Sequence, residues 1–215
     1  PDSGLDPHGS PSISREKLAT LMSRGELNGL QLAVHAIGDR AIAMTLDCFA
    51  ETGASGSIEH AMVPSAADIA RMAELGLHAS VQPVHMLADR ELIEDSWPTG
   101  AGRSFPLRSM LEAGVPLAFG TDAPVTPIDP WLAIRTAVLR AAPGQEPWNA
   151  SESLSIAQAL RSSTGRIAAL VPGGHADLIA LDENPLETDP EHLAETRVHL
   201  TMANGELTWW ADAAD

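Results

Sequence analysis

Residues 30–53 read LQLAVHAIGDRAIAMTLDCFAETG, and this stretch decides the fold class. It begins with a short apolar run that ends at His35, which is typical of a buried strand. From Asp39 onward, apolar side chains recur at helical spacing, and Gly53 follows the last of them as a helix stop. A buried strand followed directly by an amphipathic helix predicts one strand–helix unit of an α/β protein.

The same alternation repeats along the chain. Further strand-like runs lie at residues 57–62, 77–82 and 115–121. Helix-like segments lie at residues 14–24, 65–75, 105–113, 130–140 and 154–162. Residues 86–104 mix polar and apolar residues and are expected to form a long loop beyond a strand end. Strand and helix alternate four times in a row, which predicts a parallel sheet with helices packed on it.

The last part of the chain has a different pattern. Residues 176–182 and 198–209 read as strands, and Asn204-Gly205 interrupts the second of them. Asn-Gly between β-prone residues is the strongest short signal of a β-hairpin. We therefore divide the chain into an α/β part at residues 1–172 and a small β appendage at residues 173–215.

The composition excludes some classes of function. The 215 residues carry 13 Lys and Arg against 29 Asp and Glu, a formal net charge of −16. This charge argues against nucleic acid and anionic membranes as partners, because phosphate contacts need Lys and Arg. Cys48 is the one cysteine, so no internal disulfide can form, which favours a cytoplasmic protein. No apolar run approaches the roughly 18 to 20 residues of a membrane span.

Three of the four predicted strands end in residues that can bind a metal: His35, His60 and Asp122. In a parallel sheet, the carboxyl ends of the strands lie at one edge, where loops can converge. By strand alternation, His35 and Asp122 share a face with small or polar residues, as expected for the lining of a barrel. His60 fits less well, since it shares its face with Ile58 and Met62.

Each of these residues also has a purely structural interpretation. A histidine at a strand end is often held by hydrogen bonds, and an aspartate before Ala-Pro often forms a turn or caps a helix. Their joint placement on successive strand–helix units favours a metal site, because imidazole nitrogen and carboxylate oxygen are ligands of Zn²⁺. His78 and His85 are candidates for contacts around such a site, with an ordinary polar role as the alternative.

Five motifs together resemble one known family. They are Val34–Ala41 (VHAIGDRA), Glu59–Ala61 (EHA), Gln82-Pro83, Gly120–Pro124 (GTDAP) and Gly174–Asp182 (GHADLIALD). In this order they closely resemble the amidohydrolase superfamily, within the branch that includes N-substituted formamide deformylases. The resemblance extends from about Ser14 to Leu207. It implies the C-terminal half of a metal-dependent (β/α)8 TIM barrel, about four βα units, with a segment of a β-sandwich domain.

The resemblance also implies the roles of several residues. His35, His60 and Asp122 would be ligands of one or two divalent metals, usually zinc, and Asp122 would also be the catalytic base. Gln82, His85 and Arg103 are the residues we assign to substrate binding. The family's His-x-His pair does not occur in this sequence. Its strand lysine is missing too, because the single lysine, Lys17, lies in the first predicted helix. A closed barrel needs eight strands and roughly 250 residues, so an N-terminal half or another chain is expected to complete it.

These observations lead to two hypotheses for the function. The first is a metal-dependent hydrolase that cleaves a non-peptide C–N bond of a small amide, formamide or cyclic amide, present here as a C-terminal fragment that is inactive alone. The alternative is a non-catalytic regulatory or binding module derived from a half-barrel. The missing ligands favour the module for the isolated chain, whereas His35, His60 and Asp122 favour the hydrolase for a longer protein.

Overall fold

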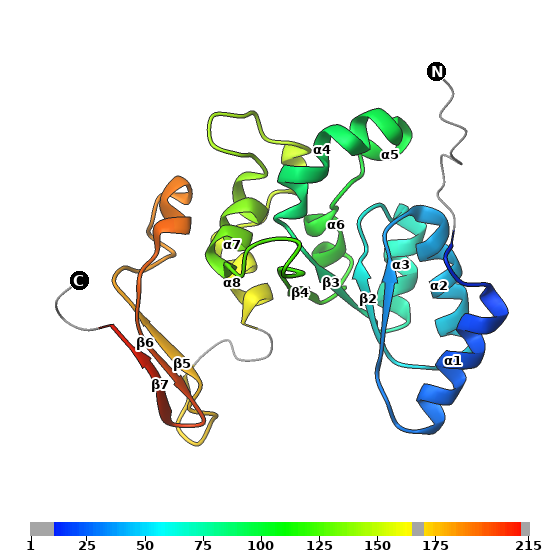
Figure 1. The fold of residues 1–215 in the computed structure, drawn as a ribbon, viewed down its shortest axis with the longest axis horizontal. Helices are drawn as coiled ribbons and strands as arrows, with labels where there is room; N and C mark the ends of the chain where they lie inside the picture. Colours follow the sequence, from blue (N-terminus) through cyan, green and yellow to red (C-terminus); the bar gives the residue numbers. More distant parts are fainter. Residues whose placement is uncertain (1–10, 165–169, 212–215) are drawn as a thin grey trace.

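A computed structural model of the chain describes residues 11–164 and 170–211 (Figure 1). Its first sheet contains the strands β1 (Leu32–Ala36), β2 (Gly56–His60), β3 (His78–Val81) and β4 (Leu117–Phe119). The strands lie in the order β1-β2-β3-β4, and each neighbouring pair is parallel. The predicted α/β class and the predicted parallel sheet are therefore confirmed.

Helices follow the strands as the sequence predicts. They are α1 (Arg15–Leu27), α2 (Asp39–Thr52), α3 (Ala66–Glu74), α6 (Leu107–Glu112), α7 (Pro130–Leu139) and α8 (Ile156–Ser163). Side-chain caps explain several of the starts: Ser65 and Ser155 each form a capping box with the residue three positions on. In Figure 1, α1, α2 and α3 lie together beside β1 and β2.

The segment expected to be a loop, residues 86–104, is largely helical, so that prediction is wrong. It contains most of α4 (His85–Ser96) and all of α5 (Pro98–Ala101). The surface of α4 is mostly polar, and Leu92 is exposed on it, so the segment lacks a continuous apolar stripe. Val84, which precedes α4, makes no side-chain cap. The two usual sequence signals of a helix are therefore both weak here.

The parallel sheet has one covered face and one open face. Ile58, Ala79 and Leu117 point toward the helices and are buried. His35 and His78 point to the opposite face and are exposed. This distribution fits the predicted alternation along β1 and β3, in which the small and polar residues share the open face, whereas β4 shows no clear alternation of burial.

A second, antiparallel sheet follows. It contains β5 (Leu178–Leu181), β6 (Val198–Ala203) and β7 (Glu206–Trp210), in that order. Asn204 and Gly205 have φ angles of 51° and 80°, the positive values that a two-residue hairpin turn requires. The predicted hairpin is therefore confirmed. Two 3-10 helices complete the described chain, η1 (Ala150–Glu152) and η2 (Pro190–Glu195).

The helix η2 joins the second sheet to the first part of the chain. Leu193 is fully buried and belongs to the hydrophobic core that the parallel sheet shares with its helices. Arg135 on α7 is buried and forms an ion pair with Glu191 of η2. The second sheet is therefore anchored to α7 by an apolar contact and a charged contact.

Arg140, the residue after α7, is the most completely buried cation of the described chain. Its guanidinium donates to the carbonyl oxygens of Trp148 at 2.6 Å, Phe105 at 3.0 Å, Ser104 at 3.2 Å and Glu152 at 3.4 Å. Burial lowers the pKa of Arg140 to about 10, which leaves it charged at neutral pH. One side chain thus ties the segment before α6 to the segment between α7 and α8.

Replacing Arg140 by Met should lower the free energy of unfolding by at least about 3 kcal/mol, because several buried carbonyl groups lose their donor. For a chain of this size, such a loss corresponds to a fall in Tm of about 6 to 12 °C. Thermal and urea unfolding would measure it. Arg161→Met, at an exposed position on α8, is the matched control and should change Tm little. Equal stability of the two variants would contradict the anchoring role.

Candidate metal centre

Three side chains with metal-binding atoms meet at the carboxyl edge of the parallel sheet. His60 ends β2, His85 begins α4 beyond β3, and Asp122 follows β4. One potential ligand atom from each lies within 4.8 Å of the other two. We call these three residues the strand-end cluster. Its members are far apart in sequence, and they are brought together because parallel strands end at the same edge.

The position of His60 depends on an unusual backbone. Its φ angle is 69°, and that of Ala61 is 43°, so the chain leaves β2 in a left-handed conformation. Backbone hydrogen bonds from Ala61 N to Ala36 O, 3.2 Å, and from Val63 N to Ile37 O, 3.1 Å, hold this turn against the end of β1. Strand alternation therefore no longer governs the side chain. This explains how His60 reaches the strand-end cluster although Ile58, two residues earlier, faces the core.

Asp122 also has a left-handed backbone, with φ 55°. Its carbonyl oxygen accepts from Val125 N at 2.8 Å, and Thr126 donates to the carbonyl oxygen of Thr121, so the segment forms a compact turn. The carboxylate is partly exposed, and its Oδ2 lies 3.8 Å from Nε2 of His85. The backbone of Asp122 thus makes the turn, while its carboxylate points to the cluster. Two left-handed non-glycine residues in one cluster are typical of a functional site.

Two buried nitrogen atoms in the cluster lack a partner. Nδ1 of His60 and Nε2 of His85 are buried and have no hydrogen-bond partner among the residues that the structure describes. Buried polar atoms without a partner are rare and call for an explanation. Burial, together with the neighbouring His35, lowers the pKa of His60 and favours the neutral ring. A neutral imidazole beside a second imidazole and a carboxylate fits a divalent metal such as zinc.

His35 lies next to the strand-end cluster but is not part of it. Its ring packs edge-on against that of His60, with the ring centroids 4.5 Å apart. The side chain is exposed on the open face of the sheet. His35 therefore borders the cluster from the side of β1, where other polypeptide could contribute to the same centre.

The two other residues assigned to substrate binding lie in different surroundings. Gln82 is buried just after β3, and its side-chain amide lies 3.4 Å from the carbonyl oxygen of Ser80. Arg103 forms an ion pair with Asp39 at 2.8 Å and lines a separate depression beside Ser65. Gln82 is therefore near the strand ends, whereas the guanidinium of Arg103 is engaged at the start of α2.

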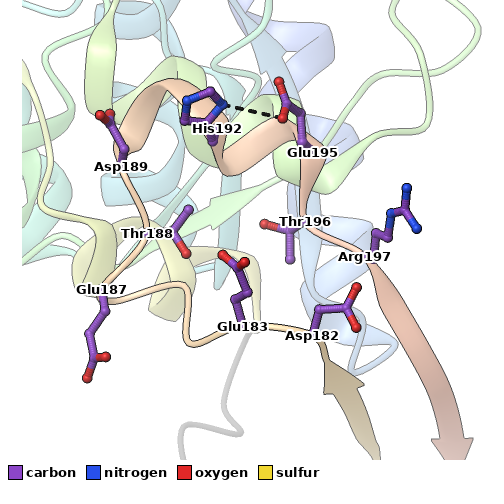
Figure 2. Close-up of a pocket in the computed structure, with 9 residues that line it drawn as sticks. All are labelled: Asp182, Glu183, Glu187, Thr188, Asp189, His192, Glu195, Thr196 and Arg197. Carbon is purple, nitrogen blue, oxygen red and sulfur yellow. Dashed lines mark hydrogen bonds and ion pairs between the residues drawn. The ribbon is translucent and has the colours of Figure 1, made fainter.

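A further hollow lies in the β appendage, beside η2 (Figure 2). Five of its lining side chains are carboxylates: Asp182, Glu183, Glu187, Asp189 and Glu195. His192 reaches Glu195 at 3.3 Å across its rim. These side chains are solvent-exposed or half-exposed, and none belongs to the strand-end cluster. The strand-end cluster, with its two buried and unpartnered imidazole nitrogens, has the properties of a metal centre, and this acidic hollow does not.

The chain resembles known proteins over most of its length. It is 32% identical to the protein LONG AFTER FAR-RED 3 of Arabidopsis thaliana, over 82% of this chain and 34% of that protein. It is 28% identical to the N-substituted formamide deformylase of Arthrobacter pascens, over 94% of this chain and 40% of that protein. The crystal structure of an uncharacterized metal-dependent hydrolase from Pyrococcus horikoshii has a TM-score of 0.69 and 26% identity, over 86% of this chain and 40% of that chain.

The fold matches a segment of the barrel in this structural neighbour, which confirms the predicted partial (β/α) barrel with an added β segment. The Amidohydrolase family matches residues 4–208. The chain belongs to the amidohydrolase family, as the motifs predicted. It spans 34% to 40% of the length of the curated relatives named above. Within the described residues, no helix is both long and apolar enough to cross a membrane.

The charges around His60 predict how its pKa responds to substitution. His35→Gln should raise the pKa of His60 toward the ordinary value of about 6.5, because a like charge is removed. Asp122→Asn should lower it further, because an opposite charge is lost. NMR titration of the metal-free protein measures both shifts. His192→Gln, on the exposed η2, is the control and should leave the pKa unchanged; shifts in one common direction would contradict the arrangement.

Proposed function

We propose that this chain contributes the C-terminal half of an amidohydrolase active site that cleaves a non-peptide C–N bond of a small amide, formamide or cyclic amide. The observation that carries the proposal is the strand-end cluster, with its two unpartnered buried nitrogens. The similarity to an N-substituted formamide deformylase supports the substrate class. The single cysteine supports a cytoplasmic location.

In this proposal, His35, His60 and Asp122 hold one or two divalent metals, with zinc as the expected ion. A bound metal of this kind would lower the pKa of water to about 7 and polarise the substrate carbonyl. Asp122 would accept the proton of the attacking water at a carboxylate oxygen and return it to the leaving nitrogen. Its partial exposure, next to a buried imidazole, suits a group that must exchange protons with substrate.

Substrate orientation is assigned to Gln82, His85 and Arg103. Gln82 and His85 lie at the end of β3, where a substrate carbonyl could approach their side chains. Arg103 would have to leave its ion pair with Asp39 to take part.

Completion of the site requires more polypeptide, supplied by an N-terminal half or by another chain. β1 and β4 are the edges of the described parallel sheet, and its open face carries His35 and His78. Unpaired strand edges and an open polar face are usually covered in a folded barrel. We therefore expect the isolated chain to bind zinc weakly and to turn over little substrate, in contrast to a protein with the whole barrel.

Asp122→Asn tests the proposal in an active protein that contains this chain. The fold should persist because the side-chain volume is nearly unchanged, and kcat should fall about 10²- to 10⁴-fold because an amide cannot accept the proton. Both kcat on formamide and amide substrates and Tm should be measured. Asp95→Asn, at an exposed position on α4, is the matched control. A folded Asp122→Asn variant with full activity would leave Asp122 as a turn residue only.

A further inference from the structure

We propose that His85 is itself a metal ligand, through Nε2, and that Asp89 positions its ring through Nδ1. This assignment goes beyond the ligands that the family resemblance implies, and it changes the role of His85 from substrate binding to metal binding. It rests on the proposed function, because it assumes that a divalent metal binds at the strand-end cluster.

The turn after β3 places His85 at the cluster. His85 N donates to the carbonyl oxygen of Gln82 at 3.1 Å, and Met86 N donates to that of Pro83 at 3.0 Å. This turn converts the end of the strand into the start of α4 without a side-chain cap. The imidazole is therefore fixed at the first residue of a helix, and its side chain is 9% exposed. A buried ring on a defined backbone is suited to hold a ligand atom in place.

The distances around Nε2 fit a shared cation better than a hydrogen bond. Nε2 lies 3.8 Å from Oδ2 of Asp122, which is too far for a hydrogen bond. Zinc binds imidazole nitrogen and carboxylate oxygen at about 2.0 to 2.2 Å, so two ligands of one tetrahedral ion lie about 3.3 to 3.6 Å apart. Nε2 is also buried and unpartnered among the described residues. A cation between these atoms would satisfy both groups.

Asp89 occupies the position that orients a ligating histidine. It lies one helical turn after His85, and side chains four residues apart share one face of a helix. Its Oδ2 is 3.8 Å from Nδ1 of His85, the ring nitrogen opposite Nε2, which is an electrostatic contact rather than a formed hydrogen bond. A carboxylate on that side favours the proton on Nδ1 and leaves the Nε2 lone pair for the metal.

The test is a titration of the whole chain with Co²⁺, followed by visible absorption, and with Zn²⁺, followed by calorimetry. His85→Gln should weaken metal binding at least about 10-fold, and Asp89→Asn should weaken it about 10-fold or more. His192→Gln and Asp95→Asn are the matched controls, at exposed positions of η2 and α4, and should bind as the wild type does. Asp89→Asn should also shift the tautomer of the His85 ring, read by ¹⁵N NMR, which a merely structural role would not do.

A second variant keeps the test decisive if His85→Gln folds poorly. His85→Cys offers a different ligand atom at the same place, and a new thiolate-to-cobalt absorption band would identify it as bound. Absence of that band in a folded His85→Cys variant that still binds Co²⁺ overturns the proposal. Unchanged affinity of His85→Gln beside loss of binding in His60→Gln overturns it too, while the proposed function stands. No metal binding by a protein that contains this chain within a whole barrel removes both.

Discussion

All strands of the first sheet run in one direction, and the candidate site depends on that constraint. Because parallel strands end at a common edge, the segments that leave β2, β3 and β4 meet there even though their residues are far apart in sequence. The helices that follow the strands cover the apolar face, and the other face keeps its small and polar residues. The ends of the strands are then the place where buried imidazoles and a carboxylate can converge.

Much of this arrangement could be predicted from the sequence, because periodicity and glycine or serine boundaries are local signals. The strands, most helices and the Asn204-Gly205 turn follow from such signals. His60 shows where they fail: alternation places it with Ile58, and only a left-handed backbone, which depends on contacts with β1, turns it to the cluster. The helix α4 was missed for a related reason, since its stability comes from its place over the strand ends rather than from an apolar stripe.

Because α4 was not predicted, the spatial relationship between His85 and Asp89 was not predicted either. When residues 86–104 are taken as a loop, His85 and Asp89 have no defined separation, and His85 is only one more polar side chain near the site. As a helix, the same segment places the two side chains on one face. Arg140 is a second side chain whose role depends on the folded chain, because its buried guanidinium holds the segment that leads into α6.

The contact between η2 and α7 has a consequence for how the molecule unfolds. Leu193 completes the core beneath the parallel sheet, and Glu191 neutralises a cation that α7 buries. Were the second sheet to detach, the first would gain a cavity and an uncompensated buried charge, each of which is costly. The two sheets, although separate in hydrogen bonding, should therefore unfold together in one cooperative transition.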